Sequence, residues 1–149
     1  MRYSLTAFGL GAAAFAVLEL TRSLQFGLFF DMTLLIDALA FALATLLLAA
    51  VLKPLLRWGS GLKVLAVAPV FFILFAPVAG ALAGVLELTL LGGWGAPDRI
   101  RSAFIAGPVN IAVDTMFGLW FVAVPLLLIV VAWLGATARA ENRFGRAAW

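Results

Sequence analysis

Four acidic residues of this sequence stand within otherwise apolar stretches, where an ionisable side chain is least expected. They are Glu19, Asp37, Glu87 and Asp114. A carboxylate within the hydrocarbon of a bilayer is costly, so it usually faces a bundle interior, a water-filled cavity or a partner protein. A water-accessible cluster of such carboxylates attracts positive charge, which suits proton coupling or cation binding.

The composition indicates the kind of protein in which these acids lie. The 149 residues are 66% hydrophobic and 11% charged, with a mean hydropathy of +1.18, whereas a soluble domain is about half apolar and a quarter charged. Cysteine and histidine are both absent, which excludes disulfides, thiol nucleophiles and zinc sites built on these residues. The net charge is only +3 and the basic residues are scattered, so we expect no nucleic-acid partner. No motif predicts a catalytic residue, a metal or a cofactor.

Four apolar stretches use nearly the whole chain and predict a single domain embedded in the lipid bilayer. A helix needs about 20 apolar residues to cross the hydrocarbon core. The expected spans are residues 4–24, 32–52, 64–91 and 104–134. Lys53-Pro54 is expected to end the second span, because proline cannot continue a helix. The predicted fold class is therefore an all-α integral membrane protein, a bundle of four transmembrane helices.

The distribution of Lys and Arg predicts how this bundle is oriented, because short cytoplasmic loops carry an excess of these residues. With the N-terminus inside, the cytoplasmic set has seven members: Arg2, Lys53, Arg57, Lys63, Arg139, Arg143 and Arg146. The opposite set has three members: Arg22, Arg99 and Arg101. We therefore expect a cytoplasmic-type membrane, inner or plasma, with both termini in the cytoplasm.

In this orientation each expected span contributes one acid to its outer half. Glu19 and Arg22 are three residues apart on one helix face and can form an ion pair. Asn110 and Asp114 share a face at four-residue spacing. We predict an acidic pocket open to the outside, above an inner half of apolar residues; the alternative is that the acids lie solvated among the headgroups. The candidate residues for an ion or substrate pathway, or for docking a partner, are Glu19, Arg22, Asp37, Glu87, Asn110 and Asp114.

A stripe of small residues in the third span predicts close helix packing. Ala76, Gly80 and Gly84 follow one another at four-residue spacing, which allows another helix to approach closely. Glu87 lies on the same side, so we expect it to face protein rather than lipid. Asp98 and Glu141 are interpreted as ordinary loop and tail residues.

Three functions could use these features. The first is a proton- or cation-linked transporter or channel that acts as an oligomer, because four helices leave little room for a pathway within one chain. The second is an accessory or assembly subunit that docks against another membrane protein through the small-residue stripe and the acids. The third is an intramembrane enzyme in which two carboxylates share a proton and activate water. We therefore expect self-association or a second membrane protein as partner.

The orientation can be tested with a single cysteine, since the natural chain has none. We expect Ser60→Cys to resist a membrane-impermeant thiol reagent in intact cells and to react after permeabilisation. Labelling of this cysteine from outside intact cells would reverse the predicted orientation.

Overall fold

The fold is built from four long helices. The computed structural model describes residues 2–26, 32–58, 61–109 and 119–146. The long helices are α1 (Arg2–Phe26), α2 (Met32–Trp58), α3 (Gly61–Leu90) and α6 (Trp120–Arg146). Each contains a segment that is long and apolar enough to cross a membrane. Two short elements, α4 (Pro97–Arg101) and the π-helical η1 (Ser102–Ala106), follow α3, and none of the described residues forms a strand.

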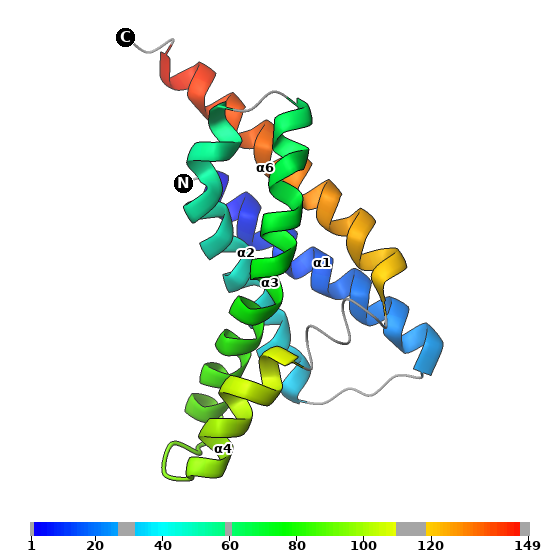
Figure 1. Cartoon of the computed structure of the whole chain (residues 1–149), viewed down its shortest axis with the longest axis vertical. Coiled ribbons are helices and arrows are strands. Elements are labelled where there is room, and N and C mark those ends of the chain that lie inside the picture. The colour runs from blue at the N-terminus through cyan, green and yellow to red at the C-terminus, as the bar shows by residue number, and fades with distance from the viewer. Residues whose placement is uncertain (1, 27–31, 59–60, 110–118, 147–149) are drawn as a thin grey trace.

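The long helices form a bundle in which α1 and α6 cross the other two at an angle (Figure 1). Helix α1 packs against α2 and α6, α3 also packs against α2 and α6, and α2 contacts α6 as well. The start of α1 and the end of α6 lie in the upper part of Figure 1, near the end of α2 and the start of α3. At the opposite end, α4 and η1 fold back beside α3. An all-helical chain with four candidate spans agrees with the fold class expected from the sequence.

The apolar core fills the middle of the bundle and the half nearer the termini. Its largest fully buried side chains include Phe71, Leu56, Leu134 and Val131, which come from α2, α3 and α6. Thr45 is also buried, and its hydroxyl donates a hydrogen bond of 2.8 Å to the carbonyl oxygen of Phe41. This bond satisfies the hydroxyl within its own helix, so the apolar core needs no water there.

Two glycines allow the long helices to approach closely. A Cβ atom at Gly11 of α1 would lie 2.6 Å from the Thr45 hydroxyl oxygen and 2.8 Å from the Ala42 Cα of α2. A Cβ atom at Gly135 of α6 would lie 2.6 Å from a methyl carbon of Val64 in α3. Van der Waals packing of this kind is a main source of association between helices in lipid, where the hydrophobic effect is weak.

A polar cluster joins three of the long helices at the end that holds the termini. We call Tyr3, Lys53, Arg57, Glu141 and Asn142 the terminal cluster. The Glu141 carboxylate accepts hydrogen bonds from the Tyr3 backbone N–H at 3.0 Å and from Lys53 Nζ at 2.9 Å. Lys53 Nζ also lies 4.4 Å from the centre of the Tyr3 ring, within the range of a cation–π contact.

Two further hydrogen bonds complete the terminal cluster. The Tyr3 hydroxyl donates to the carbonyl oxygen of Ala49 at 3.0 Å, and Arg57 donates to Asn142 at 3.0 Å. Glu141 is therefore part of an interhelical network, although the sequence indicated an ordinary tail residue. Its partners are 138 and 88 positions away in the chain, which local spacing cannot reveal.

Helix α2 differs from its expected end. It continues through Pro54 to Trp58 instead of stopping at Lys53-Pro54. Proline inside a helix costs about 3 kcal/mol through a lost hydrogen bond and a steric clash. The last turn offsets this cost because Leu56 is only 1% exposed in the core and Arg57 bonds to α6.

The fourth expected span, residues 104–134, also does not coincide with one helix. Residues 104–106 belong to η1, and the long helix begins at Trp120 and extends to Arg146. The segment that contains η1 packs against α3 through Ala103, whereas its larger apolar residues Phe104 and Ile105 are exposed. Hydropathy alone does not separate this segment from α6, because both are apolar.

The close contact at Gly11 makes a prediction about stability. We expect Gly11→Ala to lower the free energy of unfolding by about 1–3 kcal/mol, because the added methyl overpacks the α1–α2 contact. The matched control is Gly9→Ala, since a Cβ atom at Gly9 has no neighbour within 4 Å. Thermal unfolding in mild detergent measures both variants. Equal melting temperatures for the two would contradict this account of α1–α2 packing.

Candidate functional site

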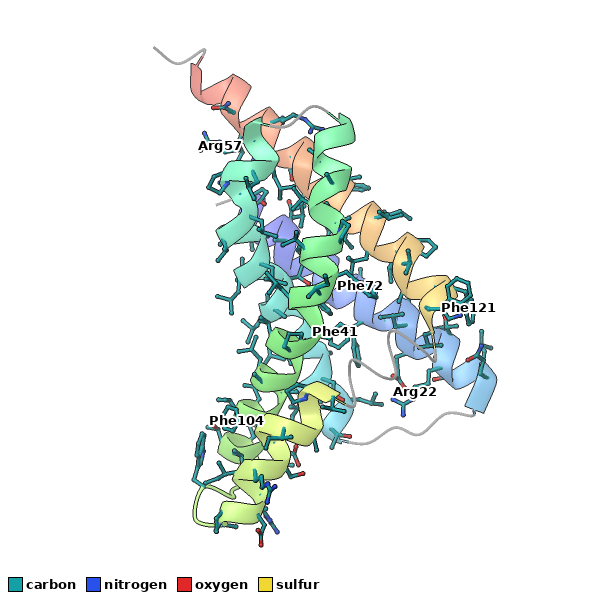
Figure 2. The ribbon with its side chains drawn as sticks, in the orientation of Figure 1. Arg22, Phe41, Arg57, Phe72, Phe104 and Phe121 are labelled. Carbon is teal, nitrogen blue, oxygen red and sulfur yellow. The ribbon has the colours of Figure 1, made fainter. Side chains whose placement is uncertain are left out.

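A pocket of about 580 Å³ lies at the end of the bundle opposite the terminal cluster. It is bounded by α1, α2, α3, α4 and η1. Its charged lining residues are Glu19 and Arg22 of α1, Asp37 of α2, Glu87 of α3 and Arg99 of α4. Figure 2 shows Phe41 near the crossing of the long helices and Arg22 farther toward the pocket end, in the space between α1 and the start of α2.

The pocket has a layered lining that follows from helix periodicity. Residues four positions apart lie on the same helix face. Three such pairs line the pocket, each an apolar residue followed toward the pocket end by an acid: Phe15 and Glu19, Phe41 and Asp37, and Ala83 and Glu87. Asp37 precedes Phe41 in sequence because α2 runs in the direction opposite to α1 and α3 (Figure 1). We call the three acids the carboxylate layer and the three apolar residues the apolar floor.

Ring packing connects the two aromatic members of the apolar floor. The Phe15 and Phe41 rings meet edge to face with their centres 5.2 Å apart. Phe41 makes a second edge contact with Phe75, at 5.0 Å. Edge-to-face pairs are a favoured geometry and add to the stability gained from burial. The floor is therefore continuous with the apolar core, to which Phe41 and Phe75 belong.

The charges of the pocket act on one another without forming close ion pairs. Asp37 is half-buried, is repelled by Glu19 and Glu87, and is attracted by Arg22. Between described residues, no ion pair joins any member of the carboxylate layer to Arg22 or Arg99. The predicted Glu19–Arg22 ion pair is therefore absent, although both side chains line the pocket. The carboxylate oxygens remain available as hydrogen-bond acceptors for a bound molecule.

The small residues of α3 position one wall of the pocket. A Cβ atom at Gly84 would lie 2.6 Å from the carbonyl oxygen of Ala103 in η1, and one at Gly80 would overlap the backbone of Pro108. Ala76, the third member of the predicted stripe, is 4% exposed. The glycines thus let the segment 103–108 lie directly on α3. This contact brings Ser102, Ala106 and Gly107 to the pocket.

Four of the six residues predicted from the sequence line this pocket: Glu19, Arg22, Asp37 and Glu87. The other two, Asn110 and Asp114, lie outside the described residues. Arg99 also lines the pocket, whereas the sequence indicated only a loop residue that contributes to orientation. Its approach depends on the turn at Gly92, whose φ of +72° favours glycine. The Arg99 guanidinium donates a 3.2 Å hydrogen bond to the Gly92 carbonyl oxygen.

No protein-family model, curated protein or solved structure matches this chain. A function must accordingly be argued from the chemistry of the site. The site offers a lining of mixed charge, an apolar floor and a volume that suits a small molecule.

The contact between Gly84 and η1 makes a local prediction. We expect Gly84→Leu to push η1 away from α3 and to raise amide hydrogen exchange in residues 98–107 several-fold, because local opening exposes these amides. Exchange within residues 40–52, in the core, should stay unchanged. Gly95→Leu is the matched control, since a Cβ atom there meets nothing within 4 Å. Exchange of residues 98–107 that stays at the control rate would disprove the positioning role of Gly84.

Proposed function

We propose that this protein is a small inner-membrane transporter or channel, linked to protons or cations, whose substrate enters the pocket. The observation that carries the proposal is the meeting of carboxylates from three candidate spans in one pocket. Acids are rare in membrane spans and commonly mark ion or substrate pathways. With both termini cytoplasmic, as the basic residues predict, the pocket opens to the outside.

The electrostatics of the pocket favour a positively charged substrate. The carboxylate layer has three formal negative charges, and Arg22 and Arg99 supply two positive charges. The lining therefore has an excess of one negative charge when all five groups are ionised. A surrounding of low dielectric strengthens the attraction between this charge and a cation.

Passage across the membrane requires the end of the bundle that holds the terminal cluster, called the closed end, to open. The apolar core contains no polar path among the described residues, and the terminal cluster joins α1, α2 and α6 at the far side of this core from the pocket. The side chains of Lys53 and Glu141 are 31% and 33% exposed, so separating this ion pair costs little, about 0–1 kcal/mol. Lys53 lies on α2 and Glu141 on α6. We propose that α6 moves relative to α2 when the closed end opens.

The low burial of α1 favours a second candidate function. A span with so low a buried share leaves much of its apolar surface available to another membrane helix. In this alternative, the protein is an accessory or assembly subunit of a larger complex. Self-association of the transporter would use the same surface, so the two functions differ in the identity of the neighbouring chain.

Transport is tested in proteoliposomes with two variants, each of which replaces one carboxylate by an amide. We expect Asp37→Asn to reduce proton- or cation-dependent flux at least about 10-fold, because it removes a half-buried charge of the carboxylate layer. Asp98→Asn is the matched control, since Asp98 is exposed on α4 and is not a lining residue of the pocket. Equal flux through the Asp37→Asn variant and the natural chain would contradict the proposal.

Native mass spectrometry after mild purification from the host separates the two candidate functions. A homo-oligomer supports the transporter. A stoichiometric complex with a different membrane protein, together with no flux from the isolated chain, would favour the subunit instead.

A further inference from the structure

The size and spacing of the site limit the kind of cation that it can bind. The pocket volume of about 580 Å³ is many times the ~30 Å³ that one water molecule occupies in the liquid. Among the described residues, no three acids are close enough together to hold a single metal ion. Members of the carboxylate layer thus face a common space without converging on one point. A cation that contacts them together must itself be large.

The apolar floor indicates what the rest of such a cation consists of. Phe15 and Phe41 form the bottom of the pocket, and Leu18, Leu88 and Leu119 add aliphatic surface to its walls. Aliphatic and aromatic side chains favour an apolar molecule over a hydrated ion, because the molecule releases water from both surfaces. The faces of phenylalanine rings also attract organic ammonium groups.

The order of the layers fixes how such a molecule would lie. Each member of the carboxylate layer is one helical turn nearer the pocket end than its partner in the apolar floor, which corresponds to about 5–6 Å along a helix. A positive group and an apolar body separated by this distance can contact both layers at once. Neither a bare inorganic cation nor a neutral apolar molecule can do so.

From these three observations, we infer that the pocket binds a small organic monocation with an apolar, preferably aromatic, body. Its charged group lies in the carboxylate layer and its body rests on the apolar floor. Binding requires no chemical step. The inference rests on the proposed function, because it names the substrate class of the same pocket.

The test uses benzyltrimethylammonium as the probe and the full chain in lipid nanodiscs. Equilibrium dialysis against empty nanodiscs measures specific binding. We expect saturable binding of benzyltrimethylammonium, and binding at least about 10-fold weaker for tetramethylammonium, which lacks the apolar body, and for benzyl alcohol, which lacks the charge. Phenylacetate, an anion with the same ring, should not bind measurably.

Variants locate the bound probe. We expect Asp37→Asn and Phe41→Leu each to weaken benzyltrimethylammonium binding about 10-fold, one through the charge and the other through the aromatic floor. Asp98→Asn, which removes an equal charge outside the pocket lining, should leave binding unchanged. Circular dichroism and size-exclusion profiles check that each variant is folded. Glu87→Gln, at an exposed position, gives a second charge variant if Asp37→Asn does not fold.

The outcomes separate this inference from the proposed function. Saturable binding without flux in proteoliposomes upholds the organic-cation site and overturns transport. Flux of protons or inorganic cations without benzyltrimethylammonium binding upholds transport and overturns the organic-cation site. Equal affinity for benzyltrimethylammonium and tetramethylammonium also overturns the organic-cation site. Binding that is insensitive to both Asp37→Asn and Glu87→Gln overturns it as well.

Discussion

The cost of placing charge in an apolar bundle governs the whole arrangement. Hydrocarbon cannot solvate ionised groups, so they must lie near water or beside polar partners. The chain meets this requirement at both ends of the bundle, with the terminal cluster at one and the pocket at the other. Between them, the apolar core joins α2, α3 and α6 through side chains such as Phe71 and Leu134. The candidate site exists because charge is confined to the two ends of the bundle and, among the described residues, forms no close ion pair at the pocket end.

The two charged ends differ in a way that bears on function. In the terminal cluster, Lys53 and Glu141 satisfy each other at 2.9 Å, and Tyr3 completes the network. In the pocket, the carboxylates and guanidiniums face a common volume without close ion pairs among the described residues. Paired charges link helices to one another, whereas unpaired charges around a cavity can bind a ligand. Charged side chains therefore connect helices at one end of the bundle and line a pocket at the other.

Glycine has two separate roles in producing this shape. Gly11 and Gly135 bring α1 and α6 close to α2 and α3, which sets where the long helices cross. Beyond the crossing, α1 diverges from α3 (Figure 1). Gly84, with Gly80, brings the segment that contains η1 onto α3 and supplies the remaining wall. A pocket thus forms where divergent helices are bridged by a short element.

The sequence by itself determined the helical class, four candidate spans and the grouping of Glu19, Asp37 and Glu87. These follow from hydropathy, helix length and the rarity of acids in apolar stretches, all of which are local properties. It did not determine the passage of α2 through Pro54, the bounds of α6, the place of Glu141 in the terminal cluster or the contribution of Arg99 to the pocket. Each of these depends on contacts between distant parts of the chain, such as Tyr3 with Glu141 and Gly84 with Ala103. Only the tertiary structure decided them, because their energies arise from packing and pairing between helices rather than from the pattern along any one helix.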